Sequence, residues 1–265
     1  MIVTTSLRAL PDDMVIARRF EAETGGRYVL RENKSLMDLQ AEYNDITLVV
    51  IERRQPVVYQ GDSRFFFHRG MAELRILNFI RSGHDPMIAA MGLAPGMSVL
   101  DCTLGLAGDA LVASYAAGTT GKVHGVEVSP VIAALTRWGL TELSSAGADA
   151  RAETRQAAAG ITVFNENHQQ FLAGLPNDSY DVVYFDPMFR RPKSASAGIQ
   201  PLRTFADAGA LSCETIQQAL RVARSRVVIK EAHGSQEFTR LGIRNFGGGR
   251  YSPVQYGLLF KEELC

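Results

Sequence analysis

The sequence contains few cysteines and no long apolar run. The three cysteines are Cys102, Cys213 and Cys265, and no pair has the Cys-x-x-Cys spacing of a zinc site. An odd number argues against a disulfide framework and suits a reducing compartment. No stretch approaches the roughly 18 apolar residues of a membrane span, and residues 1–13 lack the basic-then-apolar pattern of a secretory signal. We therefore expect a cytoplasmic protein without a membrane partner.

The chain of 265 residues also lacks net charge, because 28 basic residues balance 28 acidic ones. The strongly basic composition of many nucleic-acid-binding domains is therefore missing. One segment departs from this balance: residues 187–206 contain no acidic residue but four basic ones, Arg190, Arg191, Lys193 and Arg203. This loop could meet phosphates through counterion release, although a solvated surface loop is the simpler interpretation.

Metal-ligand patterns are missing as well. The five histidines form no i, i+4 pair and have no cysteine nearby, so we expect no metal site. Cys102 is a nucleophile by type, but no histidine in its local sequence supports activation. A small buried residue is the better interpretation of this position.

From residue 98 onward, short apolar runs alternate with helical segments. The run 98–105 precedes a helical segment over 108–118, and the run 122–129 precedes a helix that begins at Pro130. Further strands are predicted at Ile161–Phe164, Tyr180–Phe185 and Arg226–Ile229. This alternation predicts an α/β fold with a doubly wound, mostly parallel sheet covered on both faces. Segments 244–251 and 254–260, joined at Ser252-Pro253, predict an antiparallel C-terminal hairpin.

The first 95 residues also mix strand and helix patterns. Short strands are predicted at 1–5, 46–51, 57–60 and 64–67, and helices at 13–23 and 71–81. We therefore expect a small N-terminal α/β module with a connecting helix over residues 1–95, followed by the main domain over 96–265.

Candidate functional residues follow the predicted strands, where open α/β sheets bind their ligands. The first strand runs into a glycine-containing loop that would let a nucleoside approach the backbone, and the second ends in Glu127, a carboxylate suited to a ribose diol. Together they predict an adenosine-containing cofactor. The candidates in the loop are Asp101, Thr103, Gly105, Gly108 and Asp109.

The tetrapeptide Asp186-Pro187-Met188-Phe189 favours methyl transfer over hydride transfer. The loop reads Gly-x-x-Gly-Asp rather than the Gly-x-Gly-x-x-Gly of a dinucleotide fold. Asp186 and the Pro187 carbonyl offer hydrogen-bond acceptors for an exocyclic amine, and Phe189 offers a face on which a base can stack. These three are the candidate catalytic residues. The alternative, in which Asp-Pro only ends a strand and Phe189 belongs to the core, is common for such a tetrapeptide alone.

These motifs resemble the class I S-adenosylmethionine-dependent methyltransferases, and within them the family of the small-subunit ribosomal RNA guanine-N2 methyltransferase J. The resemblance covers four segments: 65–70, 100–110, 127–133 and 184–189. It implies a Rossmann-like fold and S-adenosyl-L-methionine as cofactor. The cofactor contacts that it implies are Gly108, Asp109, Glu127, Val128, Asn167, His168 and Asp186.

The resemblance also implies a function, the N-methylation of guanine in ribosomal RNA. Phe189, Arg190, Arg191 and Lys193 are then the candidate substrate-binding residues, although Arg190-Arg-Pro-Lys193 departs from the family's pattern. A paralogous group with another substrate therefore stays open. The alternatives are a methyltransferase for a small molecule or protein, a nicotinamide-dependent oxidoreductase, and an RNA-binding module of the same fold without turnover. The sequence predicts no oligomeric state.

Overall fold

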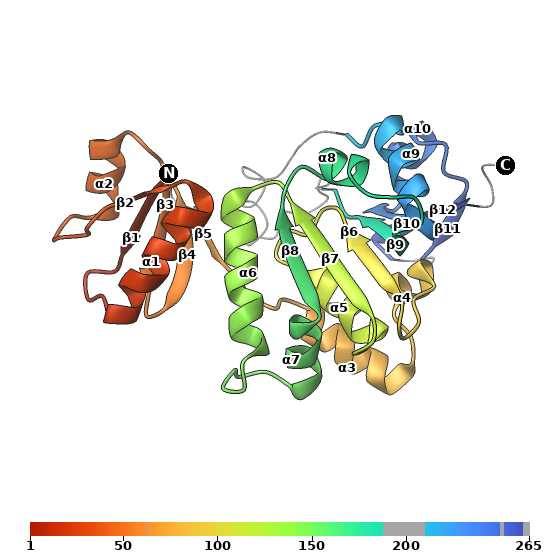
Figure 1. Ribbon diagram of the computed structural model, residues 1–265, viewed down its shortest axis with the longest axis horizontal. Helices are drawn as coiled ribbons and strands as arrows, with labels where there is room; N and C mark the ends of the chain where they lie inside the picture. Colours follow the sequence, from red (N-terminus) through yellow and green to blue (C-terminus); the bar gives the residue numbers. More distant parts are fainter. Residues whose placement is uncertain (62, 188–209, 250–251, 262–265) are drawn as a thin grey trace.

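The computed structural model describes residues 1–61, 63–187, 210–249 and 252–261, which form two sheets (Figure 1). The larger sheet has the strand order β11-β12-β10-β9-β6-β7-β8. Its parallel strands are β6 (Ser98–Asp101), β7 (Lys122–Glu127), β8 (Ile161–Asn165), β9 (Tyr180–Phe185) and β10 (Ala223–Ala232). The two remaining strands, β12 (Val254–Phe260) next to β10 and β11 (Asn245–Gly247) at the edge, pair in antiparallel fashion. The predicted doubly wound sheet and its C-terminal hairpin are confirmed.

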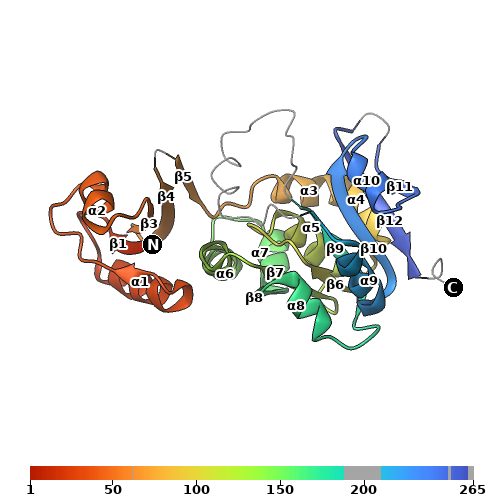
Figure 2. The same cartoon turned by 90° about the horizontal axis from the view of Figure 1, so that it is seen from above.

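Successive residues of the parallel strands face opposite sides of this sheet. In β9, Val182 and Tyr184 belong to one hydrophobic cluster, whereas Val183 and Phe185 belong to another. Figure 2 shows α3 and α5 on one side of the sheet and α8 and α9 on the other. The first cluster includes residues of α3 (Ala72–Ser82), α4 (Pro86–Met91), α5 (Gly108–Ala117), α6 (Pro130–Ser144) and α7 (Ala152–Ala159). The second includes residues of α8 (His168–Ala173), α9 (Cys213–Val222) and α10 (Gln236–Arg240).

Several short helices were not predicted from the sequence. Helices α4, α8 and α10 have five or six residues each, so their apolar residues show no clear helical period. Capping explains where α4 begins, because the Asp85 side chain accepts hydrogen bonds from the backbone N–H groups of Met87 and Ile88. Within the described part of the chain, no helix is both long and apolar enough to cross a membrane.

The N-terminal residues form the smaller sheet, with the order β2-β1-β3-β4-β5. Its strands are β1 (Ile2–Thr5), β2 (Arg27–Tyr28), β3 (Thr47–Glu52), β4 (Gln55–Gln60) and β5 (Ser63–Phe66). β1 pairs in parallel with β2 and β3, and the two hairpins that follow are antiparallel. Buried residues of helix α1 (Pro11–Thr24) pack in one hydrophobic cluster with residues of this sheet, and Leu39 of helix α2 (Leu36–Tyr43) packs in another. The expected N-terminal α/β module is confirmed, and the division at residue 95 stays a prediction.

Helix α6 lies between the two sheets (Figures 1 and 2). On its side facing the module, Gly139 packs so closely against Phe67 that a Cβ atom there would lie 1.9 Å from the ring. Arg137, two residues earlier, forms an ion pair with Glu23 of α1. The glycine in the middle of α6 is therefore explained by its contact with the module.

We expect Gly139→Ala to destabilise the protein by about 1–3 kcal/mol, because the added methyl group overpacks the contact with Phe67. Helix propensity alone predicts the opposite effect, because alanine in place of glycine inside a helix raises the free energy of unfolding by about 1 kcal/mol. Urea denaturation of the wild type and variant measures the difference. In a Phe67→Ala background the same exchange should stabilise the protein, since the obstructing ring is gone. Stabilisation of the wild type by Gly139→Ala would contradict the contact.

Candidate active site

The loop between β6 and α5 is held by a buried carboxylate. The Asp101 side chain accepts a hydrogen bond from the Thr103 backbone N–H at 3.0 Å, and Asp101 is only 3% exposed. Burial, together with the nearby carboxylates of Asp109 and Asp186, raises the pKa of Asp101 to about 8, although the hydrogen bond from Thr103 and the charge of Lys230 act against it. The predicted cofactor residue Asp101 thus supports the loop from inside.

Glu127, at the end of β7, connects this loop to the next strand. One of its carboxylate oxygens accepts the Gly105 N–H at 3.0 Å, and the other accepts the Ser129 N–H at 2.8 Å. Burial raises its pKa, whereas these backbone hydrogen bonds lower it. Each carboxylate oxygen can accept more than one hydrogen bond. Glu127 is therefore fixed in orientation and still able to accept hydrogen bonds from a diol.

The loop beside Glu127 is open at two glycines. Gly105, with φ +52°, has no atom within 4 Å of an added Cβ, and Gly108 is equally open. The carbonyl of Gly105 is in turn fixed by the Thr136 hydroxyl of α6 at 2.7 Å. Val128 presents an apolar side chain that is 38% exposed. The predicted residues Gly105, Gly108, Glu127 and Val128 therefore fit a bound nucleoside with its sugar at Glu127.

Asp186 follows β9 and is fixed through both its backbone and its side chain. Its N–H donates to the Thr103 hydroxyl at 2.6 Å, and its Oδ2 accepts a hydrogen bond from Lys230 Nζ at 2.7 Å. The side chain remains 31% exposed. Burial raises the pKa of Asp186 to about 6, with Asp109 raising it and Lys230 lowering it. Two predicted residues, Thr103 and Asp186, are thus in direct contact.

Asp109, at the start of α5, is the centre of a set of ion pairs. Its carboxylate accepts hydrogen bonds from Lys230 Nζ at 2.8 Å, from the Tyr184 hydroxyl at 2.7 Å, and from Arg75 of α3. Arg75 also binds both oxygens of Asp85, each at 3.0 Å. Burial alone would raise the pKa of Asp109, but Lys230 and Arg75 hold it below its usual value. We call Arg75, Asp85, Asp109, Asp186 and Lys230 the charge network.

Three members of the charge network were missed by the sequence analysis: Arg75, Asp85 and Lys230. Lys230 did carry a signal, because it is a lone cation directly after the buried run Val227–Ile229. Arg75 and Asp85 carried none, since a helical arginine and a helix-capping aspartate are ordinary features. The predicted contact of Asp109 with a cofactor stays a prediction, and the structure shows its carboxylate engaged by protein groups.

The remaining predicted residues lie further along the chain. The Asn167 side chain accepts the Gln169 N–H at 2.8 Å and caps α8. The centroids of the His168 and Phe185 rings are 5.9 Å apart, in an edge-to-face arrangement. Phe185 directly precedes Asp186 in the sequence. Pro187 is half-buried. Phe189, Arg190, Arg191 and Lys193 lie outside the described residues.

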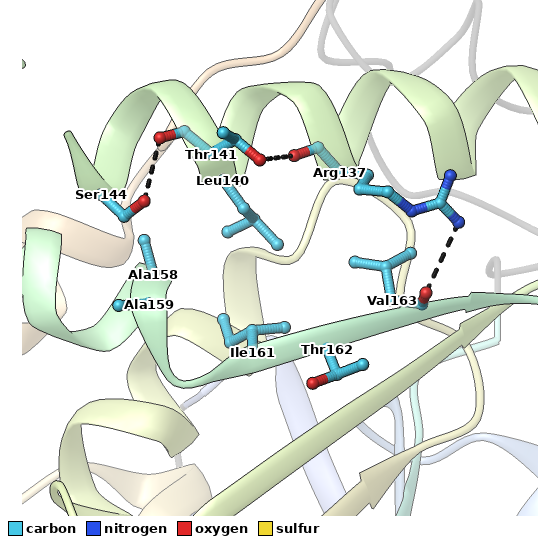
Figure 3. Close-up of a pocket in the computed structure, with 9 residues that line it drawn as sticks. All are labelled: Arg137, Leu140, Thr141, Ser144, Ala158, Ala159, Ile161, Thr162 and Val163. Carbon is cyan, nitrogen blue, oxygen red and sulfur yellow. Dashed lines mark hydrogen bonds between the residues drawn. The ribbon is translucent and has the colours of Figure 1, made fainter. Parts of the chain in front are cut away.

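Two cavities open elsewhere on the molecule. One of about 280 Å³ lies between α6, α7 and β8 and is lined by Arg137, Leu140 and Ile161 among others (Figure 3). Another of about 610 Å³ lies between α9, β12 and residues 241–245. Neither is lined by Glu127 or by the charge network. Neither cavity therefore coincides with the group of predicted residues at the carboxyl ends of the parallel strands.

We expect Asp101→Asn to stabilise the protein increasingly between pH 4 and pH 8. The folded-state pKa of about 8 lies above the usual 3.8, so the contribution of Asp101 to stability is complete below pH 3.8 and is lost as the pH rises towards 8. Asparagine keeps the oxygen that accepts the Thr103 N–H but takes no charge. Urea denaturation at several pH values should show a gain that grows to a few kcal/mol at pH 8. A gain independent of pH would contradict the burial of this carboxyl group.

Comparison with known proteins agrees with this geometry. The family model described as "Putative SAM-dependent methyltransferase" matches residues 27–240. The uncharacterized protein YpiP of Bacillus subtilis is 36% identical over 259 residues, covering 97% of this chain and 98% of its own. The ribosomal RNA small subunit methyltransferase J of Stutzerimonas stutzeri is 33% identical over 199 residues, covering 72% of this chain and 71% of its own.

A solved structure supports the fold over nearly the whole chain. The SAM-dependent methyltransferase NGO1261 from Neisseria gonorrhoeae superimposes with a TM-score of 0.68, covering 98% of this chain and 96% of its own, at 16% sequence identity. S-adenosyl-L-methionine is the cofactor that the family uses, and the open loop around Glu127 is suited to its nucleoside. On the extent of the family match and the similarity along the chain, the protein belongs to the SAM-dependent methyltransferases, with the class I, Rossmann-like fold.

Proposed function

We propose that this methyltransferase methylates a nitrogen of an RNA base, and specifically guanine N2 in small-subunit ribosomal RNA. The observation that carries the proposal is the placement of Asp186 beside the cofactor loop, with a fixed backbone and a partly exposed carboxylate. The similarity to the ribosomal RNA small subunit methyltransferase J of Stutzerimonas stutzeri supports ribosomal RNA as the substrate.

Each end of the site has a separate task in this proposal. Glu127 binds the ribose hydroxyl groups, Val128 contacts the adenine, and the loop at Gly105 and Gly108 lets the nucleoside approach the backbone. Asp186 accepts a hydrogen bond from the exocyclic amine and thereby directs the lone pair of the amine nitrogen towards the methyl group. The Pro187 carbonyl is a second acceptor for the amine. Phe189, with Arg190, Arg191 and Lys193, is assigned to the RNA base and phosphates on the sequence alone.

The bound cofactor supplies a methyl group that is already activated by its sulfonium centre. The protein therefore needs mainly to align the amine with this group and to exclude water, and such positioning contributes about 7–11 kcal/mol in well-oriented reactions. The amine becomes acidic only as it is alkylated, so its proton can leave to water afterwards. Asp186 thus acts by orientation and hydrogen bonding, and no general base is assigned.

We expect Glu127→Gln to weaken cofactor binding by about 10- to 100-fold, a loss of about 1.4–3 kcal/mol. The glutamine amide would place a donor against the N–H of either Gly105 or Ser129, so one of the two hydrogen bonds that shape the loop is lost. Calorimetry with S-adenosyl-L-methionine measures the change. Glu142→Gln, on the exposed face of α6, is the matched control and should bind like the wild type. Unchanged binding by Glu127→Gln would remove the ribose assignment.

We expect Asp186→Asn to lower the rate of methyl transfer by about 10²-fold, because the anionic acceptor that orients the amine is lost. Cofactor affinity should stay within a few-fold of the wild-type value. The assay follows tritiated methyl groups into small ribosomal subunits and into free ribosomal RNA from a strain that lacks the gene. Mass spectrometry of the same RNA, compared with that of the parent strain, locates the base. Asp178→Asn, at an exposed turn before β9, is the matched control.

The outcomes separate the two halves of the proposal. If the wild type labels a protein or a small molecule but no RNA, the RNA assignment is wrong. If RNA is labelled and Asp186→Asn is as fast as the wild type, the role of Asp186 is wrong. Loss of a methylated nucleoside other than N2-methylguanosine in the deletion strain would correct the methylated atom alone.

A further inference from the structure

Lys230 of β10 lies between two carboxylates of the candidate active site. Its Nζ atom is 2.7 Å from Asp186 Oδ2 and 2.8 Å from Asp109 Oδ2. The lysine side chain is only 19% exposed and the Asp109 side chain 12%. One ammonium group therefore connects the carboxylate that follows β9 to the carboxylate that begins α5.

The two carboxylates differ in how they are held. Asp109 has Arg75 and the Tyr184 hydroxyl as further partners, whereas Lys230 is the one cation paired with Asp186 among the described residues. Two carboxylates this close disfavour each other's ionisation unless a cation lies between them. The charged or titratable groups that act on Asp186 and its partners are Lys230, Asp109, Asp101, Arg75, Asp85, Tyr184 and Tyr256.

We propose that Lys230 is a positioning residue, whose ammonium group keeps the Asp186 carboxylate ionised and aimed at the methyl acceptor. Asp109 fixes the ammonium group from the other side, and Arg75 and Tyr184 fix Asp109. The inference extends the proposed function, because it rests on Asp186 binding the acceptor amine. The role of the charge network is then to hold Asp186 in place for the methyl acceptor.

Removal of the ammonium group has a direct consequence for Asp186. Asp109 keeps Arg75 and Tyr184 and remains ionised, so its negative charge then acts on Asp186 without the ammonium group between them. Asp186 takes up a proton more readily, and its pKa rises. A protonated carboxyl group carries an O–H donor and has fewer acceptor sites for an amine. Methyl transfer should therefore fall at neutral pH and recover as the pH is raised.

The first measurement needs no methyl acceptor. Carboxyl carbons are labelled with carbon-13 in aspartate, and the Asp186 signal is assigned by its loss in Asp186→Asn. In Lys230→Met we expect the titration midpoint of Asp186 to rise by at least about one pH unit. Lys230→Arg keeps the cation and should stay close to the wild type. Lys261→Met is the matched control, since Lys261 pairs with the exposed Asp178 instead.

The second measurement is the pH dependence of methyl transfer. The acidic limb of the kcat profile should move to higher pH in Lys230→Met by the same amount as the Asp186 midpoint, with KM for the cofactor changed less than kcat. Lys230→Arg should restore most of the activity at pH 7. If Lys230→Met does not fold, as judged by circular dichroism, Lys230→Gln takes its place in both measurements.

The results distinguish the inference from the function on which it rests. An Asp186 midpoint that does not move in Lys230→Met overturns the inference, whatever the substrate. A midpoint that moves while the kcat profile does not also overturns it, because Asp186 is then perturbed without effect on transfer. If the wild type methylates no RNA, the proposed function fails, and the profile is measured with whichever acceptor is labelled. A shift in both measurements, with recovery in Lys230→Arg, supports the inference.

Discussion

A cation shared by two carboxylates, Asp109 and the partly exposed Asp186, is the constraint on which the candidate active site depends. Removing charges from water is costly, so the lysine, the arginine and their carboxylates can stay buried only while they remain paired. The pairing fixes the relative positions of β10, β9, α5 and α3, which contribute Lys230, Asp186, Asp109 and Arg75. The loop after β6 is attached to the same assembly through Thr103 and Asp186. The charge network therefore also positions the start of the loop after β6, at Thr103.

The fold and the strand-end residues could be predicted because their signals are local in sequence. Apolar runs mark the parallel strands, and Glu127 and Asp186 lie at or directly after the ends of such runs. The charge network could not be predicted, because its members are separated by tens of residues and meet only in the packed protein. Nothing in the helical pattern around Arg75 distinguishes it from a surface arginine. Sequence spacing also gave no reason to expect that Asp109 would be engaged by three protein groups.

The family membership and the structure answer different questions. Similarity to methyltransferases shows the cofactor and the fold, whereas the contacts of Glu127 and Asp186 show how this chain arranges its own hydrogen-bond acceptors. Glu127 is held by backbone N–H groups, and Asp186 is held by a side-chain cation. Backbone groups cannot be removed by substitution, but a lysine can. Substitution can therefore remove the cation that holds Asp186, whereas the two N–H groups that hold Glu127 stay in place.

The close packing of Phe67 on Gly139 has a structural consequence. Three residues before Gly139, the Thr136 hydroxyl holds the carbonyl of Gly105 in the loop after β6, and Arg137 pairs with Glu23 of the module. Helix α6 thus contacts the N-terminal module on one side, through Gly139 and Arg137, and the loop after β6 on the other, through Thr136. The packing at Phe67 therefore lies only one helical turn from the hydroxyl group that holds the Gly105 carbonyl.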